Sequence, residues 1–444
     1  MAASANQRVQ QHCQATLSHF DAEREALVSA IPALHVKTVE LHLPSDFKLS
    51  QHLPDQGMAF IRDGEGLLGL GKRLVLSATG QDRMEQLGQQ WEKVISAATV
   101  TDPTPGPGRG LIAFGSIAFD QTSQVASTLT VPHRILGVKD GRAWLTTIEV
   151  ADFAAPTELT PDWLASEAYY PVATVNLEAG SQSATLFESS VDSALASIEA
   201  GLVKKVVLAR DLKATVGPDF DPRYAIERLA QRYPSCWTYW VNGMFGASPE
   251  LLVRVYHKQV SARVLAGTAA RGTDPGIDRA IATALTNSAK NRYEHSLAVQ
   301  SLIQALEPFC VELDSDEEPF SLALPNLWHL ASDVQGMLHQ NHSVLDLAKA
   351  LHPTAAVAGT PTREAQALIR QLEPFDRGGY SGPVGWIGAD GDGEWAIALR
   401  GASLANGTLT AFAGCGIVEG SSAAAELAET ELKFRPITQA LASS

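Results

Sequence analysis

Predicted strands and helices follow one another irregularly along this chain, and this irregularity restricts the possible folds more than any other feature. The apolar, β-branched run at 205–210 is followed by a helical pattern at 223–232 and then by strand patterns at 237–241 and 251–255. A parallel α/β fold would alternate strands and helices regularly, and a solenoid would repeat every ~20–50 residues. Neither pattern occurs, so we expect a mixed globular fold. The length of 444 residues allows up to three domains.

The N-terminal part contains only short strand patterns, such as the one at 58–62. A loop rich in Pro and Gly follows at 102–110 and marks a boundary or an excursion. Residues 125–155 alternate apolar and polar side chains between turn signals, which predicts antiparallel strands. We interpret residues 1–110 as a peripheral, N-terminal part of the same domain, and residues 111–444 as the part that carries the functional motifs.

Several segments show the apolar spacing of amphipathic helices. They span residues 188–202, 287–306, 344–351, 362–372 and 423–441. Turn residues at 387–394 predict a hairpin. The sequence GEGLLG at 64–69 has the spelling of a dinucleotide-binding loop, but a strand pattern follows it, which favours a hairpin turn.

The charge balance argues against polyanionic partners. Lys and Arg number 34 against 49 Asp and Glu, so the net charge is −15 and the chain as a whole repels nucleic acids and anionic membranes. Its four cysteines lie far apart in the sequence, without the spacing of a zinc site or a disulfide framework. The N-terminus lacks the pattern of a secretory signal, and no run of about 18 apolar residues occurs. We expect a cytoplasmic protein.

The predicted C-terminal helix carries acidic residues that could bind a metal ion. Glu426, Glu429 and Lys433 project from one side of this helix, and Glu294 on an earlier predicted helix could add a third carboxylate. Carboxylates and water are the usual ligands of Mg²⁺. The alternative is a solvated acidic face with a Glu429–Lys433 ion pair.

A glycine-rich segment at 412–420 precedes the same helix and could bring backbone N–H groups close to a carboxylate. The alternative is a tight strand-to-helix connection. Arg400, at the end of the strand pattern 395–399, could bind a carboxylate with its planar guanidinium group. Otherwise it is an ordinary edge arginine.

Two residues at the starts of strand patterns are candidates for acid–base chemistry. Lys205 begins an apolar run, where partial burial would lower its pKa and let it act as a base, while Lys204 would be solvated. Glu250 precedes the strand pattern 251–255 and could donate a proton to a leaving group. The alternative places both lysines on an exposed edge strand. His329 and His352, taken singly, are more typical of core histidines.

The order of eight motifs along residues 185–440 resembles that of the chorismate-utilising enzymes, which make isochorismate, salicylate, anthranilate or aminodeoxychorismate. The motifs are KVVLAR (205–210), SPELL (248–252), LAGT (265–268), KNRYEH (290–295), NLWHL (326–330), HPT (352–354), FDRGGY (375–380) and the glycine segment with the helix that follows it. The resemblance implies an α/β (α+β) fold: a single large domain of two packed, antiparallel-rich β-sheets surrounded by helices, as in component I of anthranilate synthase. Residues 111–444 would form the chorismate-binding catalytic region.

The resemblance also implies a metal ion in the site. Mg²⁺ would be held by Glu294 and Glu429, with Glu426 nearby through water, and would contact the ring carboxylate of chorismate. His329 would lie near the same carboxylate, and Gly267 would line the ring.

The remaining substrate contacts are implied in the same way. Arg400, Tyr380, Lys433 and the backbone from Gly414 to Gly416 would hold the enolpyruvyl carboxylate. Thr268 would line the ring beside Gly267.

The nucleophile distinguishes the members of the family. Synthases that use ammonia usually carry Gln at the position of Lys205, because ammonia needs no base, whereas water does. In isochorismate synthases, Lys205 would activate water to attack ring C2 and Glu250 would protonate the hydroxyl that leaves C4. Salicylate synthases commonly carry Thr where this chain has Ala356. The chain departs from its relatives at Ala355, where proline is frequent, and at Asn291, where some have an acid.

These features favour a magnesium-dependent isochorismate synthase that serves menaquinone or catechol siderophore biosynthesis. The alternatives are a salicylate synthase, an ammonia-using synthase and a non-catalytic chorismate sensor. We expect a monomer that uses the small molecule chorismate and needs no glutaminase subunit.

Overall fold

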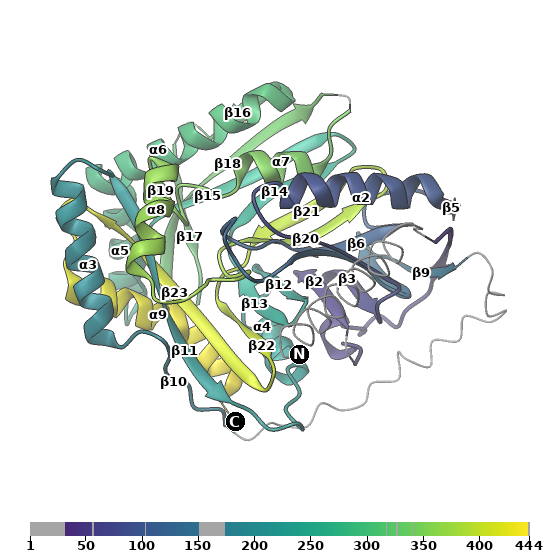
Figure 1. Ribbon diagram of the computed structural model, residues 1–444, viewed down its shortest axis with the longest axis horizontal. Coiled ribbons are helices and arrows are strands. Elements are labelled where there is room, and N and C mark those ends of the chain that lie inside the picture. The colour runs from purple at the N-terminus through teal and green to yellow at the C-terminus, as the bar shows by residue number, and fades with distance from the viewer. Residues whose placement is uncertain are drawn as a thin grey trace, which may run out of the picture.

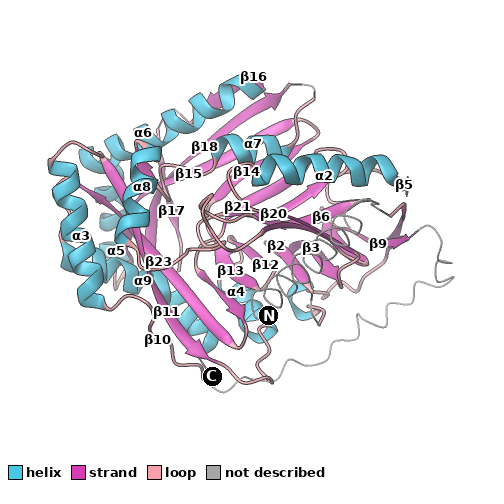
Figure 2. Cartoon of the chain, viewed as in Figure 1, coloured by secondary structure: helices cyan, strands magenta, loops and turns pink. Residues whose placement is uncertain are grey.

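The computed structural model describes residues 32–55, 57–102, 104–150, 174–316, 318–325, 327–339 and 341–442, without the side chain of Glu294. Within these ranges two large β-sheets pack against each other, and helices surround them (Figures 1 and 2). Every strand pair in both sheets is antiparallel except β1–β5. The predicted architecture of two packed, antiparallel-rich sheets is therefore confirmed.

The first sheet contains 13 of the described strands. In spatial order they are β10 (Glu178–Ala179), β11 (Lys205–Thr215), β23 (Thr408–Val418), β22 (Gly401–Ala405), β13 (Met244–Ser248), β12 (Trp237–Val241), β2 (Met58–Arg62), β3 (Glu65–Leu70), β8 (Arg134–Lys139), β9 (Arg142–Val150), β1 (Leu34–Leu41) and β5 (Ala98–Thr101), with β19 (Gly359–Thr360) paired to β11.

The second sheet contains ten described strands. Their order is β16 (Cys310–Ser315), β18 (Leu327–Leu338), β15 (Gln259–Ala270), β14 (Leu251–Tyr256), β21 (Gly393–Ile397), β20 (Pro383–Gly388), β6 (Ile112–Ser116), β7 (Ser127–Val131) and β4 (Leu74–Ala78), with β17 (Phe320–Ala323) paired to β18. β20 and β21 form the predicted hairpin.

The described helices are α2 (Arg83–Ala97), α3 (Ala184–Glu199), α4 (Arg223–Arg232), α5 (Pro275–Asn287), α6 (Ala289–Leu306), α7 (Val344–Leu351), α8 (Thr362–Leu372) and α9 (Ala423–Leu441), with short 3-10 turns η1 (Leu49–Gln51) and η3 (Glu307–Phe309). The helix predicted at 287–306 starts instead at 289, because the Ser288 side chain accepts a hydrogen bond from the Asn291 N–H and separates α6 from α5. Among the described helices, none has the length and apolarity needed to cross a bilayer.

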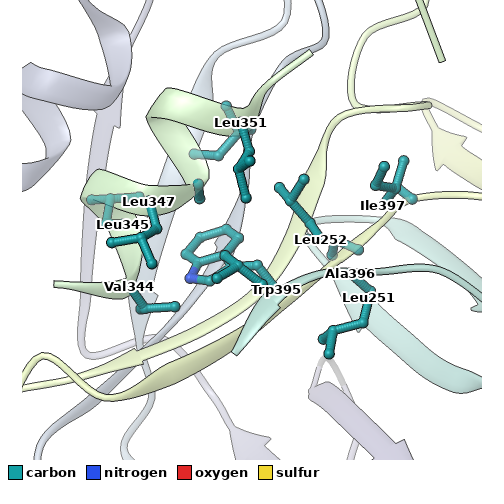
Figure 3. Close-up of a cluster of buried hydrophobic side chains, with 14 of the residues drawn as sticks. Leu251, Leu252, Val344, Leu345, Leu347, Leu351, Trp395, Ala396 and Ile397 are labelled. Carbon is teal, nitrogen blue, oxygen red and sulfur yellow. The ribbon is translucent and has the colours of Figure 1, made fainter. Parts of the chain in front are cut away.

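Two layers of apolar side chains hold the elements together. The larger layer fills the space between the sheets and extends under α2 and α7. Figure 3 shows part of it, where Trp395 of β21 lies below Leu345 and Leu351 of α7. A side chain at Gly115 of β6 would meet this indole at 2.1 Å, so glycine is required there. The smaller layer lies between the first sheet and helices α4 and α9, and includes Phe434.

The described strands β2 and β3 of the N-terminal part are not peripheral, contrary to the sequence-based expectation. β2 and β3 lie inside the first sheet, and Phe60 and Leu67 are buried in the layer between the sheets. These short strands are buried because the second sheet packs against them, and the local composition of the chain does not predict that packing. β2 and β3 form a hairpin, which confirms that the GEGLLG segment belongs to a hairpin. The turn itself lies at Asp63 and Gly64, where Gly64 has φ +82°, and residues 65–69 belong to strand β3 rather than to the predicted turn. Of the strands predicted at 125–155, residues 151–155 lie outside the described part of the chain.

Candidate active site

A cavity of about 190 Å³ lies where β11 and β23 of the first sheet meet β15 and β18 of the second, with α9 at its side. It brings together all the predicted site residues whose side chains are described: Lys205, Glu250, Gly267, Thr268, His329, Tyr380, Arg400, Gly414, Gly416, Glu426, Glu429 and Lys433. Glu294 belongs to α6, but its side chain is outside the described structure. Residues separated by more than 200 positions in the sequence thus face one space.

Most of the glycine segment at 412–420 lies in a strand, which neither interpretation of the sequence had predicted. β23 extends to Val418, and Gly414 and Gly416 pair with Ala209 and Val207 of β11. A side chain at position 414 would lie 2.9 Å from the Leu208 carbonyl oxygen, so the strand packs closely here. The apolar residues on both sides of the glycines pair with β11, which extends the strand through the segment.

The acidic face of α9 points into the cavity. Lys433 Nζ donates to Glu429 Oε1 at 2.7 Å, as the spacing predicted, and also to the Gly414 carbonyl oxygen at 2.7 Å. Burial raises the pKa of Glu429, but the charge and hydrogen bond of Lys433 outweigh it, so that the pKa lies below its usual value. Burial, together with the nearby charge of Glu429, holds the pKa of Glu426 above its usual value. The two carboxylates are therefore close enough to repel each other.

His329 is held as a neutral imidazole. Burial lowers its pKa well below the usual value, and the charges of Arg400 and Lys433 lower it further. Arg400 Nη2 lies 3.4 Å from His329 Nε2, and a guanidinium group can only donate. The ring proton therefore sits on Nδ1, which donates to Thr268 Oγ1 at 3.1 Å.

Two residues of the cavity wall have unusual backbone conformations. Gly267 has φ +90° at an irregularity in the pairing of β15 with β18, between Leu265 and Thr268. Arg400 has φ +53°, which is uncommon for a residue with a side chain, and it is 8% exposed. Such conformations persist only where the surrounding structure imposes them, and they occur often at functional sites.

Lys205 and Glu250 enter the cavity from different sheets. Lys205 begins β11 and is half-buried, whereas Lys204 is exposed. Glu250 precedes β14 and is 6% exposed. Its burial raises its pKa to about 7, even though the positive charges of Lys205, Arg400 and Lys433 favour the ionised form. A carboxyl group with this pKa can hold a proton near neutral pH and give it up.

Tyr380 completes the wall. Its ring stacks on Phe412, with ring centroids 5.0 Å apart. Ser381, Cys415 and Ser421 also line the cavity, although they were not singled out from the sequence. Only their places in the sequence could have indicated them: Ser381 follows Tyr380, Cys415 lies between two glycines, and Ser421 precedes α9.

His352 does not line this cavity. Its Nε2 atom lies 2.9 Å from the Phe119 carbonyl oxygen, as expected for a core histidine. Within the described residues, no group of three or more His, Cys, Asp or Glu side chains forms a metal-binding cluster.

Comparisons with known proteins assign the chain to a family whose members bind chorismate. The profile of a family described as chorismate binding enzyme matches residues 29–442. The chain belongs to this family of enzymes, as the order of its motifs predicted.

Two similar proteins are named as isochorismate synthases. Isochorismate synthase DhbC of Bacillus subtilis is 33% identical over 380 residues, covering 83% of this chain and 89% of that protein. The salicylate biosynthesis isochorismate synthase of Pseudomonas aeruginosa is 33% identical over 402 residues, covering 84% and 82%.

Solved structures share the fold. MenF, the menaquinone-specific isochorismate synthase of Escherichia coli, matches with a TM-score of 0.74 at 23% identity, over 96% of this chain and 99% of that one. Component I of anthranilate synthase from Streptococcus pneumoniae matches with a TM-score of 0.64 at 23% identity, over 92% and 93%.

Proposed function

We propose that this protein is a magnesium-dependent isochorismate synthase. The observation that carries the proposal is that Lys205 and Glu250, a candidate base and a candidate acid, line one cavity together with the cations Arg400 and Lys433. Isochorismate synthases are isomerases, because water that adds at one ring carbon replaces a hydroxyl lost from another. The similarity to isochorismate synthases of two bacteria supports the same conclusion.

The cavity suits a small dianion. Chorismate carries two carboxylates, and the guanidinium of Arg400 can bind one of them with two parallel hydrogen bonds. Lys433 adds a second positive charge, although it is already engaged by Glu429 and Gly414. The neutral His329 accepts a hydrogen bond from Arg400 and so orients the guanidinium towards the substrate. Tyr380 supplies a stacked ring at the wall.

The reaction then needs one proton removed and one supplied. Lys205 takes a proton from water while the water oxygen bonds to ring C2. The ring double bonds shift, and the C4–oxygen bond breaks. Glu250 donates its proton to the departing hydroxyl, which leaves as water. The burial that raises the pKa of Glu250 keeps this proton available.

The donor set at α9 fits a magnesium ion. Glu426 and Glu429 lie close enough for the charge of Glu429 to raise the pKa of Glu426, and a divalent cation would relieve that repulsion. As the resemblance implies, Glu429 and Glu294 would hold the ion, and Glu426 would lie nearby through water. When bound, Mg²⁺ would neutralise the ring carboxylate of the substrate.

We expect Glu429→Gln to raise the Mg²⁺ concentration needed for half-maximal activity by at least about tenfold, because replacing even a group that only supports a metal ligand commonly lowers metal affinity by about 10–100-fold. The measurement is a Mg²⁺ titration of activity after chelation, together with direct Mg²⁺ binding by calorimetry. Glu419→Gln, outside the cavity lining, is the matched control. An unchanged Mg²⁺ affinity would remove Glu429 from the metal site.

Product identity tests the proposed function itself. Purified protein given chorismate and Mg²⁺ should accumulate isochorismate, without dependence on ammonium. Ala356, which lines the cavity, stands where salicylate synthases commonly carry threonine, so we expect little pyruvate. Salicylate and pyruvate as main products would contradict the proposal, and tight chorismate binding without any product would favour a sensor.

A further inference from the structure

A second cavity adjoins the candidate active site on the other side of Glu250. It measures about 250 Å³, and both cavities include Glu250 and Ala356 in their walls. Its walls also include His352, Thr354 and Ser301 of α6. Ser301 is exposed whereas Glu250 is buried. The cavity therefore borders both the buried acid and a residue of the protein surface, and its walls do not include the substrate-site residues Arg400 and Lys433.

The walls of this second cavity contain two buried polar atoms that lack hydrogen-bond partners among the described residues, His352 Nδ1 and Thr354 Oγ1. His352 Nε2 lies 2.9 Å from the Phe119 carbonyl oxygen, which can only accept, so Nε2 carries the ring proton. Burial lowers the pKa of His352 to about 4, which keeps the ring neutral. His352 Nδ1 is thus a bare acceptor, and the Thr354 hydroxyl can both donate and accept.

Water is the molecule that suits these atoms. A buried polar atom without a partner is costly, and a cavity holds a water once about 10–15 Å³ is free and two or more polar groups can bind it. The volume of about 250 Å³ exceeds that requirement for several waters. Arg263 also lines the cavity, but its guanidinium already donates to Asp333 at 2.6 and 2.7 Å.

The proposed function creates a need for such a route. After each turnover Glu250 is a carboxylate and must regain a proton. A ring bound in the first cavity would separate Glu250 from the solvent on that side. While the ring is bound, the proton must therefore arrive from another direction.

We infer that the second cavity holds a water chain, ordered by Thr354 and His352, that returns a proton to Glu250 in each catalytic cycle. This inference rests on the proposed function. In the step, a water next to Glu250 gives its proton to the carboxylate and receives one from the next water, and the last water takes a proton from bulk solvent. No bond to the substrate forms or breaks, and Thr354 is a positioning residue that acts through water.

The test compares the first turnover with the steady state. Thr354→Val keeps the side-chain shape and removes the hydroxyl. The first turnover starts from protonated Glu250 and should stay within about twofold of the wild-type rate, while steady-state kcat falls about tenfold, because only the return of the proton is slowed. Thr354→Ser should restore kcat. Thr362→Val is the matched control in the same cavity, since its hydroxyl already donates to the Gly359 carbonyl oxygen at 3.4 Å.

A purely structural effect would give a different result. If Thr354→Val lowered the first-turnover and steady-state rates by the same factor, or changed neither, the proton route would be wrong. A failure of the proposed function is distinguishable, because the wild-type protein would then form no isochorismate in the first turnover.

Discussion

Lys205→Gln should abolish hydration of chorismate while leaving its binding nearly intact. We expect kcat to fall by about 10²–10⁴-fold, the usual contribution of a positioned general base, because an amide cannot take a proton from water. Chorismate affinity should change little, since Arg400 and Lys433 still supply positive charge. Product formation measured by chromatography and chorismate binding measured by calorimetry check the two parts separately.

Lys204→Gln is the matched control for this substitution. Lys204 is adjacent in sequence but exposed, so its replacement should leave kcat unchanged. Assays in ammonium buffer extend the test. If Lys205→Gln retained full hydration, the base would be another residue. If wild-type protein made an aminated ring from ammonium, the role assigned to Lys205 would be wrong.

Glu250→Gln should be equally damaging, for the opposite reason. The amide has nearly the same shape but no proton of suitable acidity for the hydroxyl that leaves C4. We expect kcat to fall by about 10²–10⁴-fold with little change in chorismate affinity. Rapid-mixing and calorimetric measurements check these two values. A variant with more than about a tenth of wild-type kcat would exclude Glu250 as the general acid.

The raised pKa of Glu250 also sets a pH dependence. Because the acid must be protonated, wild-type kcat/KM should fall as the pH rises through about 7. The same shift affects stability. A carboxyl group whose pKa rises from 4.5 to about 7 on folding contributes stability that is complete below about pH 4.5 and lost as the pH rises through 7.

The amide of the Glu250→Gln variant does not ionise, so its stability does not include this pH-dependent contribution. As the pH rises from about 5 to about 8, the free energy of unfolding of the variant should therefore increase relative to that of the wild-type protein, by at most about 3 kcal/mol. Denaturant unfolding at both pH values measures the difference. A constant difference between the two proteins would show that Glu250 does not titrate in this range.

Local patterns predicted several elements with their observed bounds. The segments 223–232, 344–351, 362–372 and 423–441 are α4, α7, α8 and α9. Each has an apolar stripe that packs against a sheet, such as Ile226 and Leu229 of α4, and the stripe alone indicates the helix. The strand that begins at Lys205 was predicted for the same reason, since its β-branched run is buried on both faces.

Other elements could not be predicted in this way. The glycine segment at 414–416 has little strand propensity, and only pairing with β11 makes it a strand. The same is true of β2 and β3, whose burial comes from the second sheet. The left-handed conformation of Arg400 has no local signal, because arginine rarely adopts it.

The amino-acid sequence by itself determined the family, through motifs in a particular order, and the identities of the groups available for acid–base chemistry. Only the tertiary structure decided that these groups face one cavity, that His329 carries its proton on Nδ1, and that a second cavity reaches Glu250 from behind. The reason is physical: periodicity and propensity act over a few neighbouring residues, whereas burial, pKa and hydrogen-bond partners depend on how two sheets pack segments that are distant in the chain.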